Sequence, residues 1–586
     1  MKNQLESLLA QALDTLKSQA LLPADFQPAI QLERSKDRAH GDWATNLALV
    51  AAKPAGRKPR DIADALVAAL PTSGVITRVE IAGPGFINFF LSSDSRFDSV
   101  RQILADVQAF SSPNVGNGEK VLLEFVSANP TGPLHVGHGR GAAYGSALAN
   151  LLAATGFKVH REYYINDAGR QADVLAVSVY LRYLEACGET VSIPSRAYPG
   201  DYVKTCGSAL CAREGRRFFR AYAEVAQGLP EDPEGEGEEI KARKEAYLDA
   251  IIERSRALLG DAYRVVQDFG LEMQLADIRT TLDAFNVQFD RWFSERTLAE
   301  SGAIGKAIDR LRERGHVYEK DGATWLATSK LGDEKDRVLV RDNGVHTYFA
   351  ADVAYHLDKL ERGFDALIDV WGADHHGYIA RLRAAIEALT GQGDSFHVAL
   401  IQFVTLSSGR MGKRSGNFVT LKQLLEEAGN DATRFFYLTR SPEQHLEFDI
   451  DLARSQTSDN PVYYLQYAHA RVSSMLRELG ERGHSFDEAT ALAALSELPE
   501  PAAEELAKRL GTWPDTVASA ARNRAPQQLT TALRDIAQEF HAYYNAHKIL
   551  VDDARSRNAR LALCLAVKAV IAQGLRLLGV SAPDRM

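Results

Sequence analysis

Two histidines flank a short, glycine-containing turn at the start of a predicted helix. The turn lies in NPTGPLHVGHGR, residues 129–140, between an apolar run at Val121–Val126 and an alanine- and leucine-rich stretch from Gly141 to Ala154. The run is typical of a buried parallel strand, and the stretch is typical of a helix packed on a sheet. The histidines are therefore predicted to lie at a switch from strand to helix.

This position suits a nucleotide triphosphate. The first N–H groups of a helix and its positive end attract phosphate, and Gly137 and Gly139 lack side chains that would keep a nucleotide away from the backbone. His135 and His138 can donate hydrogen bonds, as neutral or charged rings, to oxygens that gain charge when the α-phosphate is attacked. Without further support, two histidines beside a glycine turn are more often the start of a capped helix.

A second segment far downstream supplies that support. Residues 409–417, GRMGKRSGN, follow a strand-like run at Val398–Leu406 and precede a helical pattern from Leu421. A loop that carries Arg410, Lys413 and Arg414 can hold the β- and γ-phosphates of ATP as pyrophosphate leaves. The alternative is a solvated basic turn. The presence of both segments in one chain favours an ATP site.

A parallel sheet would bring the two segments together. Further strands are predicted at Phe157–Tyr164 and Ala366–Trp371, with helices at Asp352–Arg362 and Tyr378–Leu389. Ligands bind beyond the carboxyl ends of such strands. This rule predicts one crevice bordered by Asn129, Tyr348, Gly372–His376 and the 409–417 loop.

Three domains are predicted along the 586 residues. Residues 1–110 have the pattern of a small α/β module, with helices at Leu5–Leu16 and Asp61–Leu70 and strands at Val79–Ile81 and Phe86–Leu91. Residues 118–455 form a predicted Rossmann-like parallel-sheet domain, interrupted by a helical insertion at about 185–295. Residues 456–586 are helical in pattern, which predicts an all-α bundle. The fold class is therefore α/β with flanking domains.

Composition excludes several classes of protein. The chain has 45% hydrophobic and 25% charged residues and a formal net charge of −9, which is ordinary for a globular protein and leaves local RNA binding open. Its four cysteines make no disulfide framework and no convincing zinc site, so reduced thiols are expected. The N-terminus is unlike a signal peptide, and we expect no membrane-spanning run and a cytoplasmic location.

A candidate pocket for a cationic side chain lies next to the ATP site. Tyr348 and Asp352 are four residues apart at a predicted helix start, so both can face the crevice. There the carboxylate can take a guanidinium in paired hydrogen bonds while the ring packs on its plane. The alternative for Asp352 is a carboxylate that interacts with the helix dipole.

The substrate's α-amino group has candidate ligands after the first strand. Ser127 and Asn129 lie on the same side if that strand continues. Glu124 has the opposite parity, so a structural role competes with substrate binding unless the strand ends or bulges there.

The two motifs resemble a known pair. HVGH followed by RMGKR resembles HIGH and KMSKS, the signature motifs of the class I aminoacyl-tRNA synthetases. Over essentially the entire chain, further segments resemble bacterial arginyl-tRNA synthetases: HGDWATNLAL (40–49), GPGFINFFL (83–91), YYINDAGRQ (163–171), residues 336–365, GADHHGY (372–378) and the closing SAPDRM.

This resemblance implies an arginine–tRNA ligase. L-arginine and Mg-ATP would give arginyl-adenylate and pyrophosphate, and the 2′-hydroxyl of the 3′-terminal adenosine of tRNA-Arg would then take the arginyl group. The resemblance further implies that the amino-terminal module contacts the tRNA elbow, that the bundle reads the anticodon, and that activation requires bound tRNA. We expect Mg²⁺ to arrive with ATP, no permanent cofactor or structural metal, and a monomer.

The predicted site residues form three groups. Because the substrate carboxylate attacks, the catalytic group needs only to stabilise the α-phosphate: His135, His138 and Lys413. The predicted ATP-binding residues are Asn129, Pro130, Thr131, Gly132, Pro133, Leu134, Val136, Gly137, Gly139, Gly372, Asp374, His375, Arg410 and Met411. The predicted arginine-binding residues are Glu124, Ser127, Asn129, Tyr348 and Asp352.

The second motif departs from the family pattern. Arg410 replaces the first lysine of KMSKS, and Gly412 and Arg414 replace its serines, whereas Lys413 keeps the second lysine. Many arginine enzymes lack that lysine and carry one shortly before the HIGH motif, where this chain has Gly132 and Pro133. Arginine at 410 retains charge without the compact ammonium of lysine, which puts its share of phosphate binding in doubt.

Three other functions compete with this hypothesis. A class I synthetase for cysteine would need a zinc-ligand cluster, and one for glutamate would need a cationic pocket where Asp352 stands. A tRNA-binding paralogue without catalysis would bind tRNA but not charge it. An adenylyltransferase of small metabolites would leave both flanking domains unexplained. Aromatic and basic residues at the start of the bundle can stack on anticodon bases, although we assign most of them to its core: Tyr463, Tyr464, Tyr467, His469 and Arg471.

Overall fold

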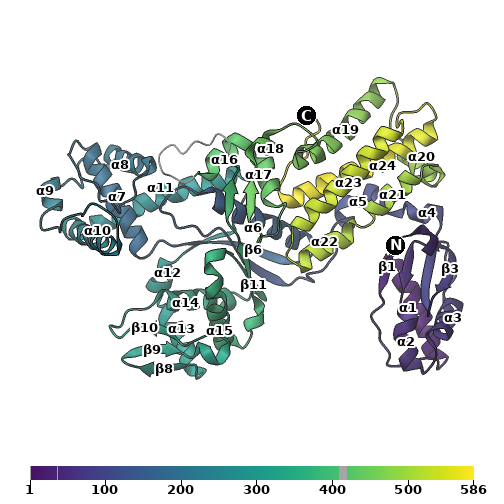
Figure 1. The fold of residues 1–586 in the computed structure, drawn as a ribbon, viewed down its shortest axis with the longest axis horizontal. Coiled ribbons are helices and arrows are strands. Elements are labelled where there is room, and N and C mark those ends of the chain that lie inside the picture. The colour runs from purple at the N-terminus through teal and green to yellow at the C-terminus, as the bar shows by residue number, and fades with distance from the viewer. Residues whose placement is uncertain (1, 36, 408–418) are drawn as a thin grey trace.

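The computed structural model describes residues 2–35, 37–407 and 419–586. Figure 1 shows an elongated molecule with a parallel sheet near its middle, a helical insertion at one end, and a helical bundle and a small amino-terminal module toward the other. The predicted class, an α/β catalytic domain with a small α/β module and an all-α carboxyl-terminal domain, is confirmed.

The central sheet has the order β12-β11-β5-β6-β7, and all of its neighbouring strands are parallel. Its strands are β5 (Lys120–Glu124), β6 (Lys158–Ile165), β7 (Arg291–Ser294), β11 (Ala366–Gly372) and β12 (Phe396–Ile401). β5, β6 and β11 were predicted, whereas the short β7 was not. The middle position of β5 explains why its last four residues are all buried.

The apolar run at 398–406 was wrongly predicted as one strand. Gln402 and Phe403 interrupt it, so that β12 belongs to the central sheet while β13 (Val404–Leu406) pairs with β14 (Leu446–Phe448). The break is held by hydrogen bonds, because Gln402 N donates to Pro442 O at 2.8 Å and Gln402 O accepts from Arg140 at 3.0 Å.

Helices cover the sheet and carry the segments that follow its strands. α6 (Val136–Ala154) connects β5 to β6 and is buried along most of its length. α14 (Tyr348–Glu361) leads into β11, and α15 (Ile379–Thr390) leads into β12. After β13 the chain continues through α16 (Leu421–Ala428), α17 (Asn430–Tyr437) and α18 (Ile450–Arg454).

Two further units interrupt the sheet between β6 and β11. The helical insertion has its own apolar core and comprises α7 (Arg170–Ala186), α8 (Asp201–Glu214), α9 (Tyr222–Val225), α10 (Glu238–Leu259) and α11 (Ala262–Ala284). The second unit was not predicted. It contains α12 (Arg296–Glu300), α13 (Ala303–Glu313) and a small antiparallel sheet of β8 (Val317–Lys320), β9 (Ala323–Leu326) and β10 (Arg337–Val340).

The amino-terminal module is a four-stranded antiparallel sheet packed on helices. Its sheet order is β1-β2-β4-β3, with β1 (Leu32–Arg34), β2 (Trp43–Thr45), β3 (Ile76–Ala82) and β4 (Phe86–Leu91). The helices are α1 (Lys2–Ser18), α2 (Leu47–Ala55) and α3 (Pro59–Ala69). Residues of these elements form a separate core. α4 (Ser93–Arg96) and α5 (Asp98–Phe110) then connect the module to the remainder of the chain.

The carboxyl-terminal bundle shares one apolar core with the central domain, and this core runs from Phe97 to Val580. Its helices are α19 (Pro461–Glu481), α20 (Glu488–Ala494), α21 (Pro501–Leu510), α22 (Trp513–Arg522), α23 (Gln527–Ala546) and α24 (Ala554–Leu578). The expectation that no run is long and apolar enough to cross a membrane was wrong for α24. That helix passes a test of length and composition, but 72% of its apolar window is buried within the protein.

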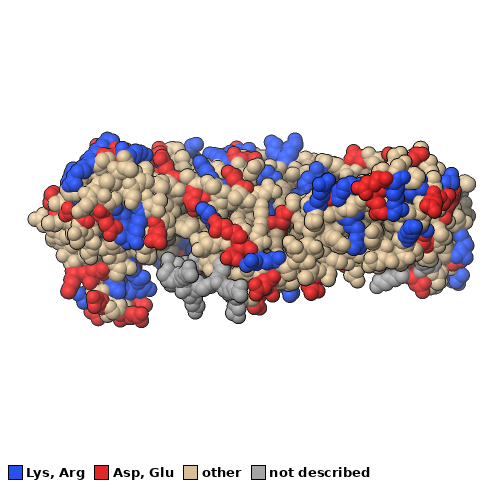
Figure 2. All heavy atoms as spheres, turned by 90° about the horizontal axis from the view of Figure 1, so that it is seen from above, with Lys and Arg blue, Asp and Glu red and all other residues tan. Residues whose placement is uncertain are grey.

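Charged side chains of both signs are interspersed over the face shown in Figure 2. The net charge of −9 is therefore not concentrated in one acidic surface there. Recognition of a ligand on this molecule must depend on local groups.

Candidate active site

The α6 amino terminus is built by the two histidines themselves. His135 is its N-cap, and His135 Nδ1 accepts from the backbone N–H of Gly137 at 3.1 Å and of His138 at 3.4 Å. In return, His138 Nδ1 accepts from the backbone N–H of His135 at 3.2 Å. This reciprocal arrangement is a capping box made of two imidazoles. The alternative that HVGH begins a capped helix is therefore confirmed, and the cap does not exclude a second role for these two histidines.

The caps determine the protonation of both rings. Because each Nδ1 accepts a backbone N–H, each neutral ring must carry its proton on Nε2. The rings stack with centroids 3.6 Å apart. Burial lowers the pKa of His135, and burial together with the neighbouring His135 lowers the pKa of His138 to about 3. At neutral pH the turn therefore presents two uncharged imidazoles, each with an N–H donor on Nε2.

The backbone N–H groups of the first α6 turn, which were expected to bind phosphate, are hydrogen-bonded within the protein. Val136 N donates to Val419 O, Gly137 N and His138 N donate to His135 Nδ1, and Gly139 N donates to His135 O. Each of these donors already has a protein acceptor. Donors for an anion at this turn must come from the imidazole rings, aided by the helix dipole.

The segment that follows the second sequence motif lies next to the HVGH turn. Leu421 N donates to Leu134 O at 2.7 Å, Val136 N donates to Val419 O at 3.2 Å, and His135 and Thr420 form an isolated β-bridge. The segment that directly follows residues 408–418 is therefore bound to the HVGH turn. Arg410, Met411 and Lys413 lie outside the described residues.

Two glycines of the turn have packing roles. A Cβ at Gly139 would lie 2.6 Å from Leu421 Cδ1 and 3.1 Å from the Tyr437 ring. The absence of a side chain at Gly139 therefore makes room for α16 and α17, whereas the sequence predicted that it makes room for a nucleotide. A Cβ at Gly137 would lie 3.0 Å from the His135 ring. Leu134 is buried in the core, so its side chain is withdrawn from any ligand.

The strand before the turn ends earlier than predicted. β5 stops at Glu124, and Val126 and Ser127 adopt left-handed φ values of 69° and 39°. Ser127 and Asn129 therefore do not share a strand face. Instead Ser127 Oγ donates to Glu124 Oε1 at 2.9 Å and accepts from Tyr164 N at 3.1 Å, and Asn129 Nδ2 donates to Gln171 Oε1 at 2.6 Å.

The loop from residue 130 to 133 is covered by the helical insertion. Thr131 is hydrogen-bonded to Tyr198, and a Cβ at Gly132 would lie 3.1 Å from Tyr202 Oη. Pro130 is buried and Pro133 is half-buried. Contacts between the insertion and this loop were not anticipated from the sequence, because about seventy residues of chain separate them.

Tyr348 and Asp352 lie in the first turns of α14, as predicted. Thr347 caps this helix by accepting from Ala350 N at 3.3 Å. The Tyr348 side chain is exposed and lies beside Gly169. The Asp352 carboxylate accepts a hydrogen bond from Tyr378 Oη. Burial raises the pKa of Asp352 although Tyr378 opposes this shift.

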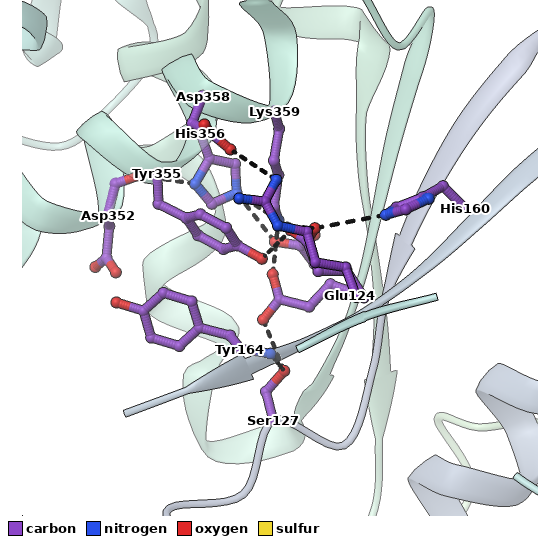
Figure 3. Close-up of polar contacts among 12 residues, drawn as sticks. Glu124, Ser127, His160, Tyr164, Asp352, Tyr355, His356, Asp358 and Lys359 are labelled. Carbon is purple, nitrogen blue, oxygen red and sulfur yellow. Dashed lines mark hydrogen bonds and ion pairs between the residues drawn. The ribbon is translucent and has the colours of Figure 1, made fainter. Parts of the chain in front are cut away.

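A second carboxylate, Glu295, lies close enough to Asp352 for their charges to interact, and it was not predicted. It is hydrogen-bonded to the Tyr164 hydroxyl, and burial followed by the charge of Asp352 raises its pKa to about 7. Figure 3 shows the Tyr164 ring beside Asp352. Two carboxylates that oppose each other's ionisation would both be stabilised by one cation between them. Glu295 directly follows β7, so the rule on carboxyl ends of strands would have found it if that strand had been recognised.

Three more acidic residues form a row across the sheet. Asp369 of β11, Glu124 of β5 and Glu162 of β6 are register neighbours on adjacent strands, and all three are buried. We call these residues the carboxylate row. Because register neighbours of a parallel sheet point to the same face, their charges would repel without counterions.

One helix supplies the counterions. Lys359 Nζ of α14 donates to Glu124 Oε2 at 2.6 Å and to Asp369 Oδ1 at 2.9 Å, and His356 Nε2 lies 3.0 Å from Asp369 Oδ2 (Figure 3). The two carboxylates raise the pKa of Lys359 against the effect of burial. Arg362 binds Glu162 through two hydrogen bonds of 2.6 and 2.8 Å. The structural role that competed for Glu124 is therefore real, and it fixes α14 against the sheet.

The remaining predicted residues lie where β11 ends. Gly372 is the last residue of β11, and Asp374 and His375 follow it on an exposed 3-10 turn, with His375 Nε2 3.7 Å from Asp374 Oδ2. β11 is hydrogen-bonded to β5, so this turn lies at the same edge of the sheet as the HVGH turn. A cavity of about 510 Å³ lies elsewhere, between α17 and α19. The chemistry, not the cavity size, identifies the candidate site.

The aromatic stripe on α19 is less buried than predicted. Only His469 is buried, Tyr467 is exposed, and Tyr463 and Tyr464 are half-buried. Tyr463, Tyr467 and His541 stack in sequence, and the Arg471 guanidinium lies 4.5 Å from the Tyr467 ring centre. The assignment of most of these residues to the core was wrong, because the stripe lies at the edge of the bundle.

Among residues 2–35, 37–407 and 419–586, no group of three or more His, Cys, Asp or Glu side chains is arranged to hold a metal ion.

Three family models match most of the chain. The family described as "tRNA synthetases class I (R), catalytic domain" matches residues 99–193 and 235–443, "Arginyl tRNA synthetase N terminal domain" matches residues 3–91, and "DALR anticodon binding domain" matches residues 465–586.

Relatives and a solved structure are similar over the full length. The arginine–tRNA ligases of Thioalkalivibrio sulfidiphilus and Halorhodospira halophila are each 53% identical, with 100% of both chains covered. The structure of the Thermus thermophilus arginyl-tRNA synthetase superposes with a TM-score of 0.73 at 25% identity and covers 100% of both chains.

Proposed function

The chain belongs to the arginyl-tRNA synthetases and is an arginine–tRNA ligase, and on this premise we propose how its residues divide the work. Arginine, ATP and tRNA are its substrates. The observation that carries the proposal is the pair of neutral, stacked imidazoles at the start of α6, at the same sheet edge as the Asp352–Glu295 carboxylate pair.

The ATP half of the site is assigned to the HVGH turn and the 408–418 loop. His135 and His138 donate from Nε2 to the oxygens of the pentavalent α-phosphate, which Lys413 also stabilises. The loop cations, Arg410 among them, hold the β- and γ-phosphates as pyrophosphate leaves. Support comes from the pairing of residues 419–421 with the turn, which brings the base of this loop to the histidines. No protein nucleophile is needed, because the arginine carboxylate attacks and the protein supplies orientation and charge stabilisation. Mg²⁺ enters with ATP.

The arginine half is assigned to α14 and the end of β7. Asp352 and Glu295 bind the guanidinium from two sides, and the exposed Tyr348 ring packs on its plane. Asn129 and Ser127 hold the α-amino group, while Glu124 acts mainly through its bond to Ser127 and its ion pair with Lys359. Burial raises the pKa of both carboxyl groups, and a guanidinium between them would favour their ionised forms.

Binding of tRNA is assigned to both flanking domains. The amino-terminal module contacts the tRNA elbow, and the bundle reads the anticodon, where the exposed Tyr467 and Arg471 offer a ring and a cation for an unstacked base. The terminal adenosine attacks through its 2′-hydroxyl, and activation requires bound tRNA. We assign the three domains to residues 1–110, 118–455 and 456–586, and we propose a cytoplasmic monomer.

Pyrophosphate exchange tests this function directly. Exchange of labelled pyrophosphate into ATP is measured with each of the twenty amino acids, with and without total tRNA. We expect exchange with arginine alone and only when tRNA is present. Exchange that peaks with another amino acid would contradict the specificity, and equal exchange without tRNA would contradict the tRNA dependence.

A further inference from the structure

The helical insertion holds two cysteine thiols in contact. Cys187 follows α7 and Cys211 lies in the last turn of α8, and their Sγ atoms are 2.7 Å apart. Both residues are partly exposed, whereas Cys206 and Cys564 are buried, and all four are free thiols. The contact joins segments that are far apart in sequence, so it depends on how the two helices pack.

The packing of α7 on α8 keeps the sulfurs together. A Cβ at Gly207 would lie 2.5 Å from the backbone carbon of Arg182, so the two helices approach closely one turn before each cysteine. Beyond the helices, Tyr183 Oη donates to Gly215 O at 2.7 Å, and Arg216 Nη1 donates to Cys187 O at 3.1 Å. These bonds fix the backbone on both sides of the thiol pair.

We propose that Cys187 and Cys211 form a reversible oxidation site that reacts with a low-molecular-weight disulfide of the glutathione type. The Cys211 thiolate attacks one sulfur of the oxidant, forms a mixed disulfide and releases one thiolate. Cys187 then loses its proton, attacks the Cys211 sulfur and releases the second thiol. The protein loses two protons and two electrons and gains one S–S bond, and the oxidant becomes two thiols.

The surroundings set the order of attack. Burial and the neighbouring Cys211 sulfur raise the pKa of Cys187 to about 11, so Cys187 stays protonated at neutral pH, and its S–H can point to Cys211 Sγ or to Gly215 O. Arg213, Arg216 and Arg217 follow Cys211, with Glu214 as the acidic residue among them. Glu185 and Glu189 flank Cys187, so the cations that can attract an anionic disulfide such as glutathione disulfide lie on the Cys211 side of the pair.

The bond would close a segment that touches the candidate active site. Tyr198 and Tyr202 lie between the two cysteines and contact Thr131 and Gly132 of the loop before HVGH. Oxidation would therefore restrain the part of the insertion that covers this loop. The inference concerns the thiols alone and is independent of the assigned catalytic roles.

Peptide mass spectrometry tests the site. The reduced full-length protein is incubated with excess glutathione disulfide under native conditions, quenched in acid, alkylated and digested. We expect a peptide pair joined through Cys187 and Cys211, with Cys206 and Cys564 alkylated as thiols. Treatment with dithiothreitol should restore four alkylated cysteines.

Three variants make the mechanism falsifiable. Cys187→Ser should trap glutathione on Cys211, Cys211→Ser should leave Cys187 largely unmodified, and Cys206→Ser should form the disulfide like the parent protein. Four alkylated thiols in the oxidised parent protein, or a bridge to another cysteine, would overturn the proposal. Equal trapping of glutathione on Cys187 in Cys211→Ser would overturn the order of attack.

Discussion

At the start of α6, His135 and His138 determine each other's protonation. Each ring accepts backbone N–H groups at Nδ1, so each carries its remaining proton on Nε2. The same atoms that cap the helix thus orient the donors proposed for the α-phosphate. In each ring the Nδ1 edge caps the helix, and the Nε2 edge carries the donor proposed for catalysis.

Two substitutions of His138 separate these uses. His138→Asn keeps an acceptor near the Nδ1 position but has no donor at the Nε2 position, whereas His138→Gln can place its amide nitrogen there. We expect His138→Asn to lower the rate of arginine-dependent pyrophosphate exchange roughly 100-fold, or about 3 kcal/mol, by analogy with oxyanion donors. We expect His138→Gln to retain more activity than His138→Asn. Equal rates for His138→Asn and the parent protein, measured with tRNA present, would refute the role of Nε2.

The low pKa values of these rings also govern stability at acid pH. The pKa of His138 is lowered to about 3 and that of His135 is lowered, so the folded protein binds fewer protons than the unfolded chain below the ordinary value of about 6.5. Their contribution to stability is complete above that pH and is lost as the pH falls toward the folded values. Between pH 7 and 8 both rings stay neutral.

The role proposed for Glu295 predicts that arginine binding depends on pH. Its pKa is raised to about 7, and a guanidinium prefers the ionised form, so arginine binding must release a proton below that pH. We expect KM for arginine to rise as the pH falls below 7, by at most about tenfold per pH unit. Glu295→Gln should raise KM at pH 8 about 10- to 100-fold, as for a lost charged hydrogen bond, and should flatten the pH profile.

The matched control is Glu300→Gln, on the adjacent helix α12 and exposed to solvent. It should leave both KM and its pH profile unchanged. If Glu295→Gln kept the pH profile of the parent protein, Glu295 would not be the group that titrates.

At the scale of elements, α14 connects specificity to the sheet. Tyr348 and Asp352 lie at its start. His356 and Lys359 further along the helix, and Arg362 directly after it, contact the carboxylate row. The ion pairs therefore set where the helix lies along the strands. That position fixes the distance from Asp352 to the sheet edge.

Lys359→Met tests this connection. The substitution leaves Glu124 and Asp369 buried without their shared cation, which should cost about 3–5 kcal/mol of unfolding free energy. The measurement is urea unfolding of the full chain. Lys306→Met, at an exposed position of α13, should change the unfolding free energy by less than about 0.5 kcal/mol. Similar effects of both substitutions would show that the carboxylate row does not need Lys359.

Elements with strong local patterns were predictable, and those with weak patterns were not. The strands β5 and β11 and the helix α6 were predictable because each contains a run of residues that are buried in the folded protein. β7 and the β8–β10 sheet consist of strands of four residues each, too short to show a period. Because β7 was not predicted, Glu295 was not predicted either: the end of that strand positions Glu295 in the site.

At the scale of the whole molecule, the separate apolar core of the amino-terminal module predicts that it unfolds apart from the bundle and the central domain. The central domain and the bundle share one apolar core, with Leu563 of α24 among its fully buried members, while the amino-terminal module has its own core around Leu9. Within the described residues, polar bonds such as Arg96–Glu504 join α4 to the bundle. We expect calorimetry of the full chain to show a smaller transition for the module and a larger one for the rest.

Two substitutions assign these transitions. Leu9→Ala should lower only the smaller one and Leu563→Ala only the larger, each by about 2–5 kcal/mol of stability. Both leucines are fully buried, so the pair is matched in chemistry and burial. If Leu563→Ala split the larger transition in two, the bundle and the central domain would unfold independently.

The sequence alone determined the class of chemistry. Residue type and order identify the HVGH and RMGKR motifs, the parallel-sheet domain that contains them, and the flanking modules, because these depend on neighbours in the chain. The tertiary structure alone decided which groups are available. It occupies every N–H of the first α6 turn, places both imidazole protons on Nε2, sets Glu295 against Asp352, and brings Cys187 to Cys211. Hydrogen-bond partners, burial and charge neighbours come from segments far apart in sequence, so no local pattern can encode them.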